Sequence, residues 1–415
     1  MDRQDIENAA EAVREIFPET PLQLNAHLSR RYGANIWLKR EDLTPVRSYK
    51  LRGAFNFMRK AIASGSGQTF ICASAGNHAQ GFAFACRHFQ VPGIVFMPVT
   101  TPQQKIDKTR MFGAEFITIR LFGDIFDQCY SAAREHVEVI GGIMVPPFDD
   151  ADIIEGQATV AAEIVAELPD GVTPDLIVLP VGGGGLAAGI TGYFEGDLPL
   201  DTFVFAEPAG APSLKSSLES GSIVTLPKVD NFVDGAAVAR IGDLNFAALK
   251  HFPAEQVVLI AENAICVTMI EMLNVEGVVL EPAGALSIAT LEQLDPELIK
   301  DRNIVCVVSG GNFDFERLPD VKERAMRHAG LKKYFILRLA QRPGALRDFL
   351  NLLGPDDDIA RFEYLKKSAR NFGSILIGIE TRDPANFAGL TQRFEEAGIG
   401  FEDITENDIL ANLII

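Results

Sequence analysis

Between residues 36 and 309, short runs of β-branched and aliphatic residues alternate with longer stretches that carry apolar residues at helical spacing. Such runs are typical of strands buried on both faces, and the intervening stretches are long enough for crossover helices. The pattern predicts strands at Ile36–Lys39, Thr69–Ala73, Ile94–Met97, Glu115–Ile119, Leu176–Pro180, Thr202–Ala206 and Ile304–Ser309. It predicts helices at Asn77–Phe89, Pro102–Phe112, Ile154–Leu168 and Leu186–Phe194. We therefore expect an α/β region with a largely parallel sheet, whose functional groups gather at the carboxyl ends of its strands.

A second pattern begins after Gly330. It predicts a strand at Tyr334–Leu339, a turn and an apolar helical stripe over 342–353, strands at Ile359–Tyr364 and Ser374–Glu380, a helix at Pro384–Ala397 and a strand at Ile399–Asp403. This βαββαβ order is typical of the ferredoxin-like α+β fold. We expect a catalytic region over residues 1–320, a linker over 321–330 and a small domain over 331–415.

The composition is that of a globular, acidic protein. Of 415 residues, 47% are hydrophobic and 23% are charged, which excludes a mostly disordered chain. Lys and Arg number 38 against 56 Asp and Glu, a net charge of −18 without a basic tract, so nucleic-acid binding is not expected. No apolar run reaches the roughly 18–20 residues that span a bilayer, and the acidic N-terminus has no signal-peptide core. Five cysteines without close pairs indicate free thiols in a reducing cytoplasm, and no zinc-binding spacing occurs.

Four consecutive glycines, Gly182, Gly183, Gly184 and Gly185, follow a predicted strand and precede the helix that begins at Leu186. Glycine lets backbone N–H groups approach a phosphate, and the helix N-terminus adds a favourable dipole, although a flexible turn has the same pattern. A P-loop would need Lys-Ser/Thr where Leu186-Ala187 stands. A dinucleotide fingerprint does fit, with Glu207 about where a ribose-binding acid belongs, so the glycines leave NAD and a small phosphorylated cofactor both open.

Three further segments carry candidate chemistry. In Arg47–Ala54, Lys50 stands at the start of a helix, where the dipole and burial lower an amine pKa and favour Schiff-base formation. Ser74–Gly81 follows a strand and offers backbone donors for a carboxylate, although Asn77 could be only a helix N-cap and His78 is more typical of a packed or solvent-facing residue than of a base. Ser309–Asn312 follows the last predicted strand, and its hydroxyl could bond a ring nitrogen, although alone the segment would be an ordinary turn.

Together these segments resemble the four signature segments of the pyridoxal-phosphate threonine dehydratases. The four are Ser48–Ala54, Ser74–His78, Gly182–Leu186 and Ser309–Asn312, and Phe232–Val238 and Glu281–Ala285 are also similar to the family. The family belongs to the fold-type II group, with serine dehydratase and the tryptophan synthase β chain. The resemblance runs from about residue 5 to 320, and residues 331–415 resemble the single ACT-like regulatory domain of the shorter biosynthetic members.

The resemblance implies a role for each matching residue. Lys50 would bind pyridoxal 5'-phosphate covalently and remove the α-proton of the substrate. Gly182, Gly183, Gly184, Gly185 and Leu186 would hold the phosphate, and Asn77 would bond the ring hydroxyl. Ser309 would face the ring nitrogen, while Ser74, Gly76 and Asn77 would seat the substrate carboxylate.

The implied activity is dehydration and deamination of L-threonine to 2-oxobutanoate and ammonia, the first committed step of isoleucine biosynthesis. The resemblance also implies a homotetramer in which isoleucine inhibits the enzyme through the C-terminal domain and valine opposes this inhibition. A serine dehydratase or racemase, an NAD-dependent oxidoreductase and a non-catalytic amino-acid sensor are the alternatives. Residues 209–213 lack the acidic side chains with which racemase-like relatives bind a divalent ion, which leaves any metal undetermined.

Overall fold

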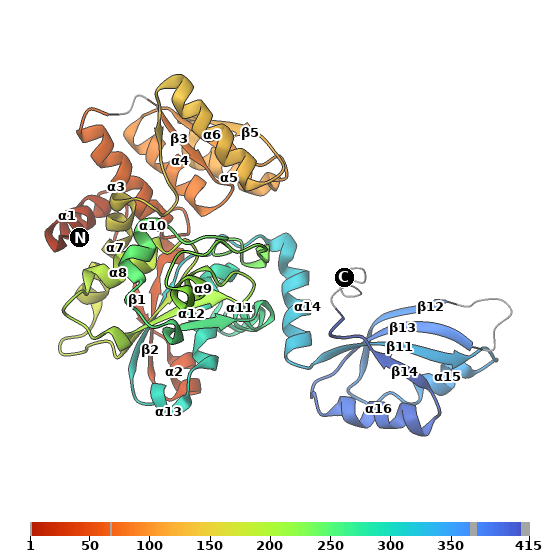
Figure 1. Ribbon diagram of the computed structural model, residues 1–415. Coiled ribbons are helices and arrows are strands. Elements are labelled where there is room, and N and C mark those ends of the chain that lie inside the picture. The colour runs from red at the N-terminus through yellow and green to blue at the C-terminus, as the bar shows by residue number, and fades with distance from the viewer. Residues whose placement is uncertain (1, 67–68, 366–371, 408–415) are drawn as a thin grey trace. The chain divides into compact units, whose positions relative to one another are not determined.

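The computed structural model describes residues 2–66, 69–365 and 372–407 (Figure 1). The chain divides into two compact units, Met1–Asp314 and Phe315–Ile415. This division lies before the expected end of the catalytic region at residue 320. Most of the segment expected as a linker, 321–330, belongs to helix α14 (Leu318–His328), which packs against strand β11 (Lys332–Ala340) within the second unit.

The first unit contains two separate sheets rather than one. The larger has the order β1-β2-β10-β7-β8-β9 and the smaller β5-β4-β3-β6; neighbouring strands are parallel except for the antiparallel pair β1 and β2. The strands are β1 Leu22–Leu24, β2 Asn35–Arg40, β3 Phe70–Ala73, β4 Gly93–Met97, β5 Ile117–Leu121, β6 Ile143–Met144, β7 Leu176–Pro180, β8 Phe203–Pro208, β9 Val257–Ile260 and β10 Asn303–Val308. The strand expected at Glu115–Ile119 begins only at Ile117, because residues 114–116 form a 3-10 turn.

Helices cover both faces of the smaller sheet, which occupies the orange-to-yellow part of Figure 1. Side chains of alternate strand residues point to opposite faces. Accordingly, Phe70 and Cys72 pack with residues of α4 and α5, while Ile71 and Ala73 pack with residues of α6. The helices of the first unit are α1 Arg3–Arg14, α2 Ala26–Tyr32, α3 Lys50–Ala63, α4 Asn77–Phe89, α5 Gln103–Gly113, α6 Phe126–Ile140, α7 Ala151–Glu167, α8 Gly185–Tyr193, α9 Ser213–Ser220, α10 Asp243–Leu249, α11 Glu262–Glu276, α12 Pro282–Thr290 and α13 Pro296–Ile299.

The larger sheet is arranged in the same way. Ile177 and Leu179 of β7 and Val305 of β10 pack with α7 and α8 in one apolar cluster. Helix α12 packs against β7, β8 and β10. Burial on both faces explains why these strands read as continuous apolar runs in the sequence.

The second unit has the expected ferredoxin-like order. Its sheet is antiparallel, with the order β12-β13-β11-β14. Its remaining elements are α15 Ala345–Leu350, β12 Asp358–Leu365, β13 Phe372–Glu380, α16 Asn386–Glu396 and β14 Gly400–Asp403. Phe335, Phe349 and Phe394 anchor an apolar core of its own between the sheet and the two helices. Within the residues that the structure describes, no helix of either unit is long and apolar enough to cross a membrane.

Candidate active site

The first and last signature segments lie directly against each other. Ser48 and Gly310 form an isolated antiparallel bridge, and the Tyr49 N–H donates to the Ser309 carbonyl at 3.2 Å. The Gly311 N–H donates to the Arg47 carbonyl at 2.9 Å. These bonds fix the start of α3 beside the carboxyl end of β10, where a catalytic group is expected in a parallel sheet.

Lys50 is the first residue of α3, and its amine faces a backbone carbonyl rather than a carboxylate. The Nζ atom donates to the Pro147 carbonyl at 2.8 Å and lies 5.2 Å from the Tyr49 ring centroid and 5.7 Å from that of Phe148. Burial lowers the pKa of Lys50 to about 8, against an opposing effect of Glu281. A substantial share of neutral amine is therefore present near pH 8, and a neutral amine is the form that attacks an aldehyde.

The glycine loop lies against Phe148, next to the residue that Lys50 contacts. A Cβ atom at Gly183 would lie 2.3 Å from the Phe148 ring, and one at Gly185 would lie 2.9 Å from the Phe148 carbonyl. Gly184 has φ +92°, a left-handed conformation that favours glycine. Helix α8 begins at Gly185 without a side-chain cap, so its first-turn N–H groups have no partner inside the helix. This loop fits a phosphate, and the shared segment Pro147–Phe148 joins it to the Lys50 amine.

Asn245, in α10, fixes this arrangement, although no sequence motif singles it out. Its buried amide donates to the Gly183 carbonyl at 2.7 Å and to the Phe148 carbonyl at 3.2 Å. Asp149 accepts from two backbone N–H groups at the start of α10, both at 2.9 Å. No local pattern in the sequence relates Asn245 to residue 183, because the two lie 62 positions apart.

The second signature segment approaches Lys50 through the backbone of α4. A Cβ atom at Gly81 would lie 3.0 Å from the Leu51 backbone, so this glycine permits the close contact between α3 and α4. His78 is buried, and its Nε2 lies 2.9 Å from the Val145 carbonyl. Burial and the nearby Lys50 charge lower the pKa of His78 to about 4. His78 is thus a packed, neutral residue, and its bond to a carbonyl gives no support for a role as base.

Asn77 is more than a helix cap. The N-cap of α4 is Gly76, and the Asn77 amide instead contacts two distant side chains. Its Nδ2 donates to Glu281 Oε1 at 2.6 Å, and its Oδ1 accepts from Asn312 Nδ2 at 2.8 Å. The second and fourth signature segments therefore meet at this amide.

The remaining predicted side chains, Ser74 and Ser309, each make a hydrogen bond within the protein. Ser74 Oγ accepts from the Gly76 N–H at 3.2 Å, so the loop before α4 is internally bonded. The Ser309 hydroxyl is buried and donates to the Ala283 carbonyl at 3.1 Å. A hydroxyl can rotate and also accept hydrogen bonds, so this contact is compatible with a second partner.

Glu207 does not serve as the acid of a dinucleotide site. Its fully buried carboxylate accepts from the N–H groups of Leu214 at 2.7 Å and Lys215 at 2.9 Å, which caps the start of α9. Burial raises the pKa of Glu207 to about 7, against the effect of these bonds. Because its oxygens are already bonded within the fold, the structure removes the carboxylate on which the NAD interpretation depended.

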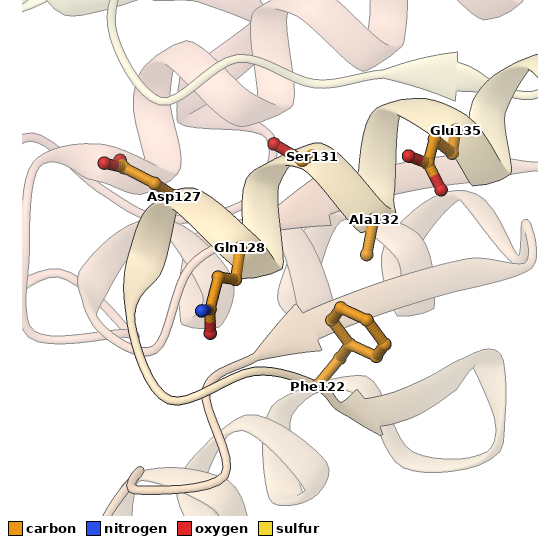
Figure 2. Close-up of a pocket in the computed structure, with 6 residues that line it drawn as sticks. All are labelled: Phe122, Asp127, Gln128, Ser131, Ala132 and Glu135. Atoms are coloured by element: carbon orange, nitrogen blue, oxygen red, sulfur yellow. The ribbon is translucent and has the colours of Figure 1, made fainter.

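A pocket lies on the surface beside helix α6, away from the predicted site. The pocket is lined by Phe122, Asp127, Gln128, Ser131, Ala132 and Glu135, and it contains none of the predicted site residues (Figure 2). No group of three or more His, Cys, Asp or Glu side chains is placed to hold a metal ion among residues 2–66, 69–365 and 372–407.

Comparison with known families agrees with this geometry. Residues 13–310 match the family described as pyridoxal-phosphate dependent enzyme, and residues 323–414 match the C-terminal regulatory domain of threonine dehydratase. The biosynthetic L-threonine dehydratase of Halalkalibacterium halodurans is 42% identical over 413 residues, 99% of each chain.

Solved structures give the same result for the fold. The processed form of threonine deaminase isoform 2 from Solanum lycopersicum superposes with a TM-score of 0.71 at 38% identity, over 78% of this chain and 93% of that one. Maize serine racemase has a TM-score of 0.70 at 24% identity, over 79% of this chain and 98% of that one, which shows the shared fold alone. The chain therefore belongs to the pyridoxal-phosphate-dependent enzymes, and within them to the family of the biosynthetic L-threonine dehydratases.

Proposed function

We propose that the protein dehydrates and deaminates L-threonine to 2-oxobutanoate and ammonia, with Lys50 as the catalytic residue. The observation that carries the proposal is the link between the Lys50 amine and the glycine loop through Pro147–Phe148. A phosphorylated aldehyde bound here would have its aldehyde at the Lys50 amine and its phosphate at the glycine loop. The relatives that match along the whole chain are named L-threonine dehydratases, which supports threonine as the substrate.

The residues of the chain then have separate tasks. Gly182, Gly183, Gly184, Gly185 and Leu186 hold the phosphate through backbone N–H groups. Asn77 would donate to the ring hydroxyl, and Ser309 would face the ring nitrogen. Bound pyridoxal phosphate supplies an aldehyde for the amines of Lys50 and substrate and a conjugated ring that withdraws electrons from the α-carbon.

Lys50 performs the proton transfer. Its Nζ atom, with a pKa of about 8, is neutral in about half of the molecules at pH 8 and in about a tenth at pH 7, and in the neutral form it would accept the α-proton of the substrate. The β-hydroxyl would then leave as water by taking up a proton equivalent to the one removed by Lys50. One water is consumed when ammonia is released, so the net products are 2-oxobutanoate and ammonia. Ser74, Gly76 and Asn77 at the start of α4 orient the substrate carboxylate toward backbone donors, which keeps the α-proton within reach of Nζ.

The test combines a spectrum with a product assay. Purified protein should show visible-edge absorbance that changes on addition of L-threonine, and borohydride should fix the cofactor on Lys50. Lys50→Ala should lose 2-oxobutanoate release and borohydride labelling, whereas Lys60→Ala, which changes a partly exposed lysine on the same helix, should retain both. Labelling at a different lysine would refute the proposal. Faster keto-acid release from L-serine than from L-threonine would move the assignment to a serine dehydratase.

Regulation, assembly and location belong to the same proposal. We infer that isoleucine binds the C-terminal unit and favours a state of low substrate affinity, that valine opposes it, and that the protein is a cytoplasmic homotetramer. Five buried free thiols, Cys72, Cys86, Cys129, Cys266 and Cys306, are typical of a reducing compartment. Coupling of this kind amounts to about 1–3 kcal/mol and is reciprocal between effector and substrate.

The effector proposal has its own test. Gly344, with φ +84°, is the N-cap of α15 and follows the Arg342-Pro343 turn, so a side chain there strains the loop. Gly344→Ala should weaken isoleucine inhibition while activity without effector is retained. The effector assignment would be contradicted if Gly344→Ala left isoleucine inhibition unchanged, or if inhibition persisted after deletion of residues 331–415. Light scattering tests the tetramer separately.

A further inference from the structure

Glu281 stands at the N-cap position of α12, but its side chain makes no capping bond and lies in the site instead. The residue is buried, and its Oε1 accepts from Asn77 Nδ2 at 2.6 Å. A Cβ atom at Gly310 would lie 2.1 Å from the same Oε1, so the carboxylate fills the space that a side chain at residue 310 would need. The glycine in the fourth signature segment therefore makes room for Glu281.

Two partners of opposite polarity hold the Asn77 amide. An ionised carboxylate can only accept a hydrogen bond, so above its pKa of about 7 Glu281 requires the amide nitrogen on its side. Asn312 Nδ2 donates to Asn77 Oδ1 at 2.8 Å and also to the Val46 carbonyl at 2.7 Å, so it requires the amide oxygen on the other side. The amide consequently has one orientation, with its second N–H group left for a ligand.

Glu281 also lies close to the start of α3. Its N–H donates to the Gly310 carbonyl at 3.4 Å, and Gly310 bridges Ser48, two residues before Lys50. Burial raises the pKa of Glu281 to about 7; Asp234 adds to this effect, while the bond from Asn77 and the charges of Lys105 and Lys108 oppose it. Burial lowers the pKa of Lys50, and the charge of Glu281 opposes that shift. Glu281 also adds to the raised pKa of Tyr49, which lies beside Lys50. The carboxylate is thus the negative charge that partly offsets the burial of a protonated lysine.

We propose that Glu281 is a positioning residue of this site: it orients the Asn77 amide toward the ring hydroxyl and supplies the negative charge that balances protonated Lys50. The inference rests on the proposed function, since Asn77 and Lys50 are the residues through which Glu281 acts. It assigns a task to a carboxylate that touches neither the reacting atoms nor the glycine loop. The two tasks separate experimentally, because one depends on hydrogen bonding and the other on charge.

The experiment uses the full chain freed of cofactor. The rate at which added pyridoxal phosphate becomes fixed on Lys50 by borohydride is measured against pH, which reports the proton on Lys50 independently of turnover. In the unchanged protein the midpoint should lie near pH 8. Glu281→Gln keeps an acceptor for Asn77 and removes the charge, so the midpoint should fall by about one unit. Glu281→Asp keeps the charge at a shorter reach and should restore the midpoint.

The absorbance maximum of the bound cofactor tests the Asn77 part. Glu281→Ala removes the acceptor and should shift this maximum and weaken cofactor affinity about tenfold, a change of about 1.4 kcal/mol. Glu281→Gln should shift the maximum less. Melting temperatures identify any variant that does not fold, in which case the Gln and Asp variants carry the test.

Glu207→Gln is the matched control, because Glu207 is also a buried carboxylate with a pKa raised to about 7 but caps α9. It should lose stability without moving the Lys50 midpoint. An unchanged midpoint in Glu281→Gln, or an equal shift in Glu207→Gln, overturns the inference. If the unchanged protein is not labelled at Lys50 at all, the proposed function fails instead, so the two failures are distinct.

Discussion

Arg52 donates two hydrogen bonds of 2.7 Å to the two carboxylate oxygens of Glu163, and both side chains are buried. The same guanidinium also pairs with Glu41 at 2.7 and 2.8 Å. Arg52 follows Lys50 by two residues on α3, and Glu163 lies on α7, so this ion cluster joins the helix that carries the lysine to the helix packed beneath it. Because a bidentate pair fixes the orientation of the guanidinium relative to the carboxylate as well as their distance, it limits rotation of α3 about its axis.

The first prediction concerns the stability of this cluster. Arg52→Met should lower the free energy of unfolding by about 3–5 kcal/mol, because Glu41 and Glu163 would remain buried without their main cation. Chemical denaturation of the two proteins measures the difference. Arg30→Ala, which changes an exposed arginine on α2, serves as the control and should stay within about 0.5 kcal/mol. A loss of similar size in both variants would show that the buried ion cluster contributes no more to the free energy of unfolding than an exposed arginine does.

The second prediction concerns acid. Burial alone would raise the pKa of Glu163, but Arg52 and Lys39 lower it to about 2 from an ordinary 4.5. A carboxylate whose pKa is lower in the folded state stabilises the fold fully above its unfolded pKa and loses this effect as pH falls through the folded value. The difference in unfolding free energy between the unchanged protein and Glu163→Gln should therefore be largest above about pH 5 and shrink toward pH 2. A difference that does not vary with pH would contradict this assignment.

Much of the catalytic region was predictable because its signals are local. Helix α4 spans Asn77–Phe89 and strand β7 spans Leu176–Pro180, both as predicted, since periodicity and flanking glycines mark them. Strands β1 and β6 are too short to show a period, and their existence depends on pairing with β2 and β3. The split into two sheets is likewise a property of long-range pairing that no local pattern records.

Some residues of the candidate site could likewise be predicted from local sequence signals, and others could not. Residues with a special backbone or a marked chemistry, such as Gly184 and Lys50, could be predicted from their positions next to strands and helices. Asn245 and Glu281 could not, because each acts on a residue far away in the chain, at 62 and 204 positions. Glu281 stood in a segment similar to the family, yet nothing in that segment indicated its contact with Asn77.

The third prediction concerns the glycine loop. Gly183→Ala should weaken cofactor affinity at least about tenfold, because the new Cβ atom would lie 2.3 Å from the Phe148 ring and the loop would have to move. Spectrophotometric titration of cofactor-free protein gives the dissociation constant. Gly389→Ala, on helix α16 of the second unit, is the matched control; its Cβ atom meets only the flexible end of Arg393 at 3.3 Å. Equal cofactor affinities in the two variants would show that the contact between Gly183 and Phe148 does not shape the cofactor site.

The fourth prediction concerns Asn245, whose side chain holds the glycine loop through backbone carbonyl groups and leaves the N–H groups of the loop available for a phosphate. Asn245→Ala removes the donors to the Gly183 and Phe148 carbonyls, while the Gly242 N–H still bonds Gly183 at 3.2 Å. Each lost hydrogen bond is worth about 0.5–1.5 kcal/mol, so cofactor affinity should fall by about tenfold and the melting temperature by a few degrees. Asn8→Ala, at an exposed position of α1, should change neither quantity. Because Asn245 also fixes the segment that Lys50 contacts, the rate of borohydride fixation at Lys50 should fall together with the affinity, whereas a loop that only bound phosphate would leave that rate unchanged at saturating cofactor.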